Sequence, residues 1–242
     1  MATVLVTRPR VDSERLAQML KQHGFDSVIE PLLTIKLTTT QLPDIKAVQA
    51  VMITSANALD ALAEGGQSMD TLLDLPCFCV GSRTAERAGA FGFRNTHAGK
   101  GDGIELAELI AAKNIGKLLL HIAGQDTDRK AQNALEQRGF EVIFWPVYTA
   151  LSATALTETT VQLIRQHKLD AVLAFSVRTA QALMALLKKH ELEACCESLS
   201  AIGLSDAVTD VLGQRAWRRI VTATEPNEDA VIECLKRLYP VP

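Results

Sequence analysis

A strand–turn–helix unit occurs twice in this chain, and it constrains the fold more than any other feature of the sequence. In the first copy, the apolar run Ala50–Ile53 is too short for a helix and stops at two hydroxyl residues. From Ala56 onward the apolar residues recur at helical spacing, which indicates a buried strand that runs directly into a helix. The two copies are identical at five positions: Ala50, Val51, Ser55, Ala61 and Leu62 in the first, and Ala171, Val172, Ser176, Ala182 and Leu183 in the second.

Further segments repeat in the same order in both halves of the chain. The period is more than a hundred residues, so the sequence indicates a duplicated domain rather than a solenoid. Strands are predicted to alternate with helices throughout, which is typical of an α/β fold with parallel sheets. The matching positions are Leu20, Gln22, Gly24, Phe25, Pro31, Val80, Gly81 and Ala85 in one copy, and Leu135, Gln137, Gly139, Phe140, Pro146, Ile202, Gly203 and Ala207 in the other.

The repeats leave two domain divisions open. Sequence order alone places a boundary near Gly116. The stretches Ile35–Pro43 and Val147–Ala153, however, are both predicted to be extended connectors. If they pair side by side, the chain crosses between two lobes twice. One lobe then comprises residues 1–35 and 153–242, the other comprises residues 39–148, and residues 36–38 and 149–152 are the linker strands.

Three local signals predict where elements begin or end. Asp12 or Ser13 is expected to cap the first helix, because both side chains can accept a backbone N–H. By the same argument, Asp126 or Thr127 is expected to cap a later helix. Pro146 is expected to stop the strand that precedes it, because proline cannot donate to a strand ladder.

Composition excludes several classes of protein. The formal net charge is −3 with both signs mixed along the chain, so nothing favours a nucleic-acid surface. No apolar run is long enough to span a bilayer, and the N-terminus lacks the pattern of a signal peptide, so a cytoplasmic protein is expected. The five cysteines and five histidines show no metal-ligand spacing. No metal site is therefore expected.

Several predicted strands end in a turn that carries Gly, Ser or Thr and leads into a helix. Such turns present backbone N–H groups and the positive end of a helix dipole, which favour anions. One contact contributes about 0.3–1 kcal/mol when exposed, whereas micromolar binding needs roughly 8 kcal/mol. A ligand bound in this way must contact several turns, which favours a large polyanion. At any single turn, ordinary folding requirements are the favoured explanation.

Motifs of the common enzyme classes are missing from the sequence. No phosphate-binding P-loop and no nucleophile elbow are present, and the glycines of Gly99–Gly103 lack the spacing of a dinucleotide fingerprint. Tyr148, in the second connector, is the one side chain of chemical interest. Its phenol could face a cleft between lobes, or it could simply pack at a domain junction.

An ordered set of short motifs extends over nearly the whole chain. The set consists of Val4–Pro9, Thr54–Asn57, Val80-Gly81 with Thr84-Ala85, Gly101–Gly103, Pro146–Tyr148, Phe175-Ser176 with Arg178–Ala180, and Gly203 with Ser205. This set resembles the uroporphyrinogen-III synthase family. The resemblance implies two flavodoxin-like parallel-sheet lobes, internally duplicated and joined by a two-stranded linker. It also implies a cytoplasmic monomer without metal or cofactor, which contacts the preceding enzyme of its pathway transiently.

The resemblance further implies an activity and a set of site residues. The reaction is closure of the linear tetrapyrrole hydroxymethylbilane to uroporphyrinogen III, with inversion of ring D and loss of water, in haem biosynthesis. Tyr148 is implied as the proton donor to the departing hydroxyl. Asp206 replaces a hydroxyl residue and is expected to point away as a helix cap. The implied substrate-binding residues are Thr7, Arg8, Ser55, Asn57, Gly81, Thr84, Gly101, Asp102, Gly103, Ser176, Arg178, Gly203 and Ser205.

One alternative function belongs to a different class. A duplicated two-lobed α/β protein could be a non-enzymatic sensor or regulator that binds a small anion. A DNA-binding appendage would favour that interpretation, and the sequence contains none. A dehydrogenase is disfavoured by the missing nucleotide fingerprint.

Overall fold

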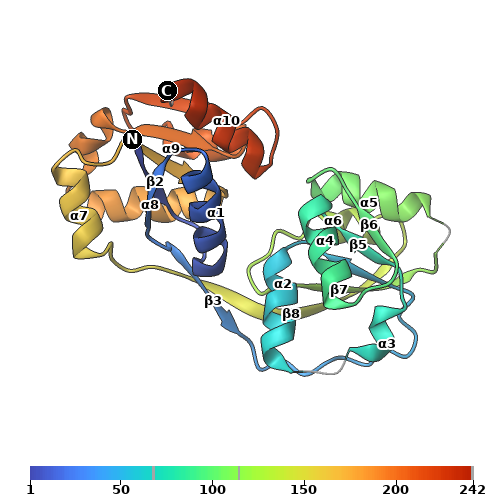
Figure 1. Ribbon diagram of the computed structural model, residues 1–242. Coiled ribbons are helices and arrows are strands. Elements are labelled where there is room, and N and C mark those ends of the chain that lie inside the picture. The colour runs from blue at the N-terminus through green and yellow to red at the C-terminus, as the bar shows by residue number, and fades with distance from the viewer. Residues whose placement is uncertain (67–68, 114, 241–242) are drawn as a thin grey trace. The chain divides into compact units, whose positions relative to one another are not determined.

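The computed structural model describes residues 1–66, 69–113 and 115–240, and the chain divides into two compact units (Figure 1). Unit 1 consists of Met1–Thr34 and Leu151–Pro242, and unit 2 consists of Ile35–Ala150. The chain therefore passes from one unit to the other twice. Both passages are extended, because β3 (Leu33–Leu37) and β8 (Glu141–Ser152) each include the residues at which the units meet.

Unit 1 contains a five-stranded sheet in the order β11-β10-β9-β1-β2, in which all neighbouring strands are parallel. Its strands are β1 (Thr3–Val6), β2 (Asp26–Ile29), β9 (Ala171–Ala174), β10 (Ser200–Gly203) and β11 (Arg219–Thr222). Its helices are α1 (Arg10–Gln22), α7 (Glu158–Arg165), α8 (Val177–Lys189), a 3₁₀ helix (Glu193–Ser198), α9 (Asp206–Leu212) and α10 (Glu228–Leu238).

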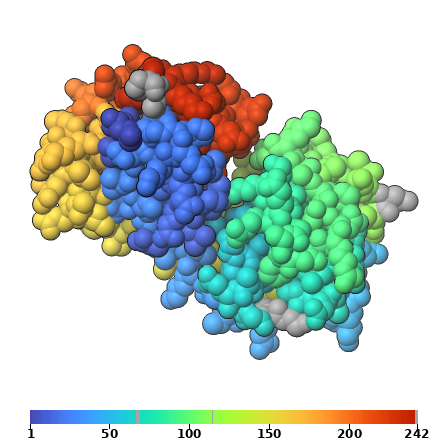
Figure 2. Space-filling view, viewed as in Figure 1, coloured from blue at the N-terminus to red at the C-terminus, as the bar shows by residue number. Residues whose placement is uncertain are grey.

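Alternation along β1 shows how this sheet divides its helices between two faces. Val4 and Val6 pack with α1 and α10, whereas Leu5 packs with α7, α8 and α9. Strands buried on both faces read as continuous apolar runs, which is why β1 and β9 appear so clearly in the sequence. Figure 2 shows the blue residues of α1 beside the red residues of α10 on the surface of unit 1.

Unit 2 contains a six-stranded sheet in the order β3-β8-β7-β4-β5-β6. Besides β3 and β8, its strands are β4 (Ala50–Ile53), β5 (Cys77–Cys79), β6 (Thr96–Ala98) and β7 (Leu118–Gly124). Its helices are α2 (Ala56–Gly65), α3 (Asp70–Leu73), α4 (Ser82–Phe91), α5 (Gly103–Ala112) and α6 (Lys130–Glu136). Helices α2, α3 and α4 cover one face, and α5 and α6 cover the other.

The two sheets have the same strand order when the repeat is taken into account. Unit 1 reads β2-β1-β9-β10-β11, and unit 2, apart from its additional edge strand β3, reads β8-β7-β4-β5-β6. Both correspond to the 2-1-3-4-5 order of flavodoxin-like folds. Strands β7 and β8 of unit 2 occupy the positions of β1 and β2 of unit 1. In the chain, however, they follow β4, β5 and β6. The predicted α/β fold of two parallel-sheet lobes is confirmed.

The two connectors pair with each other. Strand β3 neighbours β8 in the sheet, and the Thr38 N–H donates to the Val147 carbonyl at 3.1 Å. At the other end of the connectors, the Ala153 N–H donates to the Leu32 carbonyl at 2.9 Å. Pairing satisfies backbone groups that two separate extended segments would leave to water.

The expectation that Pro146 ends its strand is wrong. Strand β8 continues through Pro146, and its register with β7 shifts at that point: Ala123 pairs with Pro146, but Gly124 pairs with Tyr148. The extra residue is a bulge, which accommodates a proline inside a ladder. The Pro146 carbonyl still accepts the Thr38 hydroxyl at 2.6 Å.

Both expected helix caps are also wrong. Helix α1 follows Pro9, and the Ser13 hydroxyl lies inside the helix and donates to the Arg8 carbonyl at 2.7 Å. Helix α6 starts at Lys130, later than Asp126 or Thr127 would require. Sequence patterns locate helix ends less well than helix centres, because several polar residues near an end can satisfy its backbone N–H groups.

Among the described residues, no helix has the length and apolar character needed to cross a membrane.

Candidate functional site

The site residues expected from the sequence lie where parallel strands end and helices begin, within each unit. In unit 1, Thr7 and Arg8 follow β1, Ser176 follows β9, and Ser205 follows β10. In unit 2, three turns hold seven of the expected residues. Ser55 and Asn57 follow β4, Gly81 and Thr84 follow β5, and Gly101, Asp102 and Gly103 follow β6. The carboxyl edge of a parallel sheet is where such folds bind ligands.

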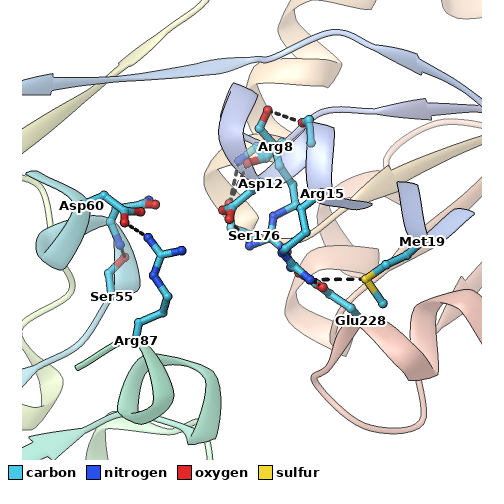
Figure 3. Close-up of polar contacts among 12 residues, drawn as sticks. Arg8, Asp12, Arg15, Met19, Ser55, Asp60, Arg87, Ser176 and Glu228 are labelled. Carbon is cyan, nitrogen blue, oxygen red and sulfur yellow. Dashed lines mark hydrogen bonds and ion pairs between the residues drawn. The ribbon is translucent and has the colours of Figure 1, made fainter. Parts of the chain in front are cut away.

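Arg8 is held by two carboxylates of its own unit (Figure 3). Its guanidinium lies 3.0 Å from Asp12 Oδ2 and 2.5 Å from Glu228 Oε1, and it stacks 4.6 Å from the centre of the Phe175 ring. Arg15 also bonds Glu228, which raises the pKa of the Arg15 guanidinium. The Asp229 carboxylate also acts on Arg15 and raises its pKa. A ligand carboxylate would therefore have to compete with Glu228 for Arg8.

Thr7 and Gly203 have structural duties at the same edge. Thr7 is fully buried, and its hydroxyl donates to the Leu173 carbonyl at 2.6 Å, which ties β1 to β9. A Cβ at Gly203 would lie 2.6 Å from Thr209 Cγ2, so only glycine lets α9 approach β10 this closely. Any ligand contact at these two positions would be made by the backbone.

The two serines of unit 1 stand at helix starts. Ser176 caps α8 by accepting the Thr179 N–H at 3.1 Å. Ser205 occupies the N-cap position of α9, and Asp206 is the exposed first residue of that helix. The expectation that Asp206 is the cap is therefore wrong. An acidic residue in the first turn still favours the helix through the dipole.

Arg178 lines a groove of about 570 Å³ along α8, within unit 1. The groove combines two basic side chains with small apolar ones. Lys189, at the far end of the helix, is tied to the Thr154 carbonyl at 2.6 Å. The lining residues are Ser152, Ala153, Thr154, Arg178, Gln181, Ala182, Ala185, Leu186 and Lys189.

In unit 2, the turns after β5 and β6 adjoin. A Cβ at Gly81 would lie 3.9 Å from the Cα of Gly101, and the Gly101 N–H donates to the Val80 carbonyl at 2.7 Å. Gly101 has φ 102°, a conformation that favours glycine. Asp102 caps α5 by accepting the Ile104 N–H at 2.7 Å. Its carboxylate therefore occupies the anion position at that helix start.

Thr84 and Ser55 differ in accessibility. Thr84 is 6% exposed and packs inside α4, whereas Ser55 is half-buried at the start of α2. The Asn57 N–H donates to the Ser55 hydroxyl at 3.3 Å. Figure 3 also shows Arg87 of α4 paired with Asp60 of α2, which braces the two helices beside this turn.

Tyr148 is buried in unit 2, with 7% of its surface exposed. It lies on β8 opposite Gly124, and the space that a Cβ of Gly124 would need is filled by its ring. Its carbonyl accepts the Gln125 N–H at 2.7 Å. The phenol is thus packed at a strand junction and, at the same time, lies at the carboxyl end of β7.

Comparison with known proteins identifies the family. The family model described as "Uroporphyrinogen-III synthase HemD" matches residues 14–233. The chain belongs to the uroporphyrinogen-III synthase HemD family.

Solved members of this family share the fold at low sequence identity. The uroporphyrinogen-III synthetase of Helicobacter pylori is 18% identical with a TM-score of 0.70, and 98% of this chain and 100% of that chain are covered. A mutant uroporphyrinogen III synthase of Thermus thermophilus is 16% identical with a TM-score of 0.60, and 98% of each chain is covered. No curated protein matches the sequence significantly.

Sequence reasoning missed several residues at the edges of these HemD-type lobes. Asp12 and Glu228 engage Arg8, although neither lies in a recognisable motif. His121 has no metal-ligand spacing to another histidine or cysteine in the sequence, yet it is completely buried beside the turn after β4. The one available signal was a histidine inside the apolar strand Leu118–Gly124. Within the described residues, no three His, Cys, Asp or Glu side chains gather as a metal site requires.

Proposed function

We propose that this protein is a uroporphyrinogen-III synthase. It closes hydroxymethylbilane to uroporphyrinogen III, with inversion of ring D and loss of water. The observation that carries the proposal is the family match over residues 14–233, together with the expected site residues at the carboxyl edges of both sheets. The protein acts as a cytoplasmic monomer without a cofactor and receives its substrate from the preceding enzyme of the pathway.

The proposed mechanism depends on orientation more than on strong acid–base chemistry. The same linear tetrapyrrole closes without the enzyme to the type I isomer, so the protein must hold one folded conformation of the substrate. The substrate carries eight carboxylates, and helix starts at Ser55, Gly81 and Ser176 present N–H groups suited to them. Several such contacts, each of about 0.3–1 kcal/mol, act together.

Tyr148 is proposed as the proton donor to the departing hydroxyl. A neutral phenol is a weak acid, and it fits a reaction whose leaving group needs only one proton. Because water can partly replace a general acid, loss of the phenol is expected to reduce turnover rather than abolish it.

A coupled assay tests the function. The purified protein is given hydroxymethylbilane without added metal or nucleotide, and the isomers of the oxidised product are separated. Predominantly type III product is expected. Type I product alone, formed at the spontaneous rate, would refute the proposed enzymatic function. A two-lobed anion-binding sensor would then be the better account.

The chain offers a matched control for Tyr148, because it contains only two tyrosines. The Tyr239 hydroxyl donates to the Asp170 carbonyl at 2.7 Å and lies 2.8 Å from Ser200 Oγ, so its role is structural. We expect Tyr148→Phe to lower kcat, and Tyr239→Phe to lower stability while leaving kcat unchanged. Equal kcat values for both variants would exclude Tyr148 as the proton donor.

A further inference from the structure

A polar side chain lies where the sequence pattern calls for an apolar one, beneath α6 of unit 2. His121 is on β7, opposite Met52 of β4 and Phe144 of β8, and it is completely buried. Its ring meets Phe144 edge-on, with centroids 5.5 Å apart. Its neighbours on this face form an apolar cluster. Burying an imidazole costs free energy unless its nitrogens have hydrogen-bond partners, so the partner of each nitrogen must be identified.

The first nitrogen contacts Thr54. His121 Nε2 lies 3.0 Å from Thr54 Oγ1. Thr54 is the residue directly after β4, two positions beyond Met52, so its side chain is on the same face of the sheet as the histidine. Unlike His121, Thr54 is only half-buried. The contact therefore connects the interior of unit 2 with the turn that leads to Ser55 and α2.

The second nitrogen, Nδ1, is considered together with Gln132 of α6, the side chain that interacts with the His121 imidazole. His121 Nδ1 and Gln132 Oε1 are both buried, and neither has a hydrogen-bond partner among the described residues. The interaction with Gln132 nevertheless opposes the lowering of the His121 pKa, so the two groups are neighbours. Gln132 Nε2 donates to Glu136 Oε1 at 2.8 Å, which fixes the amide with its oxygen free.

The need to satisfy buried polar atoms favours one position for the imidazole proton. A bare Nδ1 would place two buried acceptors beside each other, whereas an Nδ1–H supplies the donor that Gln132 Oε1 lacks. Nε2 is then bare and accepts the Thr54 hydroxyl proton. With that proton committed, Thr54 Oγ1 can offer only lone pairs to a ligand.

The ring is also neutral at physiological pH. Burial lowers the pKa of His121 to about 4, the interaction with Gln132 partly opposes the shift, and the Arg129 guanidinium lowers it further. Arg129 stacks on Phe144, whose ring contacts His121 edge-on. The Arg129 Cζ lies 4.1 Å from the centre of the Phe144 ring. A neutral imidazole with a bare Nε2 is therefore the resting form.

We infer that His121 is a positioning residue that makes the Thr54 hydroxyl a hydrogen-bond acceptor, specific for an N–H or O–H group of the ligand. The inference rests on the proposed function, in which the substrate carries four pyrrole N–H groups and one hydroxymethyl group. Carboxylates would be excluded from Thr54 and left to the neighbouring backbone N–H groups of α2. One turn would thus distinguish the ring of the substrate from its acidic side chains.

Nuclear magnetic resonance of the ligand-free protein tests the proton position without any assay of activity. The protein is labelled with ¹⁵N-histidine, and the His121 signals are identified by their absence in His121→Gln. The nitrogen shifts are expected to report a proton on Nδ1 and none on Nε2 at pH 7. A proton on Nε2, or an imidazolium at that pH, would overturn the inference. Because this result needs no substrate, it is independent of whether the synthase reaction occurs.

Kinetics test the coupling between the two residues. Thr54→Val and His121→Leu are each expected to lower kcat/KM for hydroxymethylbilane by about three- to tenfold, the value of one hydrogen bond. The double variant should lose no more than either single variant. His121→Gln should retain more activity than His121→Leu, since its amide can still reach Thr54. Losses that multiply in the double variant would contradict the inference.

A matched control is available on the same sheet. His97 of β6 stacks on Phe78, with centroids 4.8 Å apart, and has no part in the proposed site. His97→Leu is expected to change kcat/KM by less than about twofold. A loss as large as that of His121→Leu would show that any histidine removed from this sheet has the same effect, and the positioning role would be refuted.

Discussion

Adding one methyl group at Gly124 tests how tightly Tyr148 is held. A Cβ built on Gly124 would lie 2.6 Å from Tyr148 Cζ, 2.8 Å from Cε2 and 2.9 Å from the hydroxyl oxygen. Carbon atoms at optimal contact are about 3.5–4.0 Å apart. The ring must therefore move by about 1 Å in Gly124→Ala. Because the ring is packed in a buried cluster with Trp145 and Val147, this movement must disturb the packing of the cluster and lower stability.

The expected cost is that of overpacking a core. Such insertions destabilise by about 1–3 kcal/mol. Tryptophan fluorescence during urea unfolding can follow unit 2 selectively, because one of the two tryptophans, Trp145, lies in that unit, and a Trp217→Phe background removes the other. Gly89→Ala is the matched control. A Cβ there meets nothing within 4 Å, and alanine in a helix is expected to stabilise by about 0.5–1 kcal/mol.

A double-mutant cycle isolates the contact. In a Tyr148→Leu background the offending ring atoms are missing, so Gly124→Ala should add almost no cost. A displacement of about 1 Å also misplaces the phenol, so Gly124→Ala should slow the proposed reaction by up to as much as Tyr148→Phe does. A stability change below about 0.5 kcal/mol in Gly124→Ala would refute the packing of the ring against this glycine.

Two further predictions concern buried polar groups. Glu30 is 3% exposed and accepts the Thr157 N–H at 3.2 Å and the Thr157 hydroxyl at 2.5 Å. Glu30→Ala should therefore lower the free energy of unfolding in urea by about 1–3 kcal/mol. Glu158 is exposed, so Glu158→Ala should lower it by less than about 0.5 kcal/mol. The folded-state pKa of His121, about 4, is below its unfolded value of about 6.5, so its contribution to stability is complete above pH 6.5 and is lost as pH falls towards 4, by about 3 kcal/mol in total. Subtracting the unfolding curve of His121→Gln from that of the wild type over this range should isolate the effect, and a flat difference would contradict it.

Much of the fold could be read from the sequence, for a definite physical reason. Strands buried on both faces, such as β1, β4 and β9, appear as continuous apolar runs, and the change to helical spacing after each one is local information. The duplication needed only the order of such units. The sequence did not predict the 3₁₀ helix Glu193–Ser198 or the short α3, because elements this brief contain too few residues to establish a period.

The site was predictable only in part. Local pattern placed Ser55, Ser176 and Asp102 at helix starts, where the structure has them as N-caps. The family resemblance also implied Thr7 and Thr84 as binding residues, and the structure buries both. Whether a side chain near a strand end faces solvent or the neighbouring strand depends on the register between strands, which is not a local property.

The sequence by itself determined the alternation of strands and helices, the duplicated plan and the turns at the strand ends. Tertiary structure alone decided which side chains meet there. Arg8 is bound by Glu228, which is 220 positions away in the chain, and His121 contacts Thr54 across 67 positions. These contacts follow from the order of strands within each sheet and from desolvation, which forces buried polar groups to find partners. Neither of these has a signature in a short window of sequence.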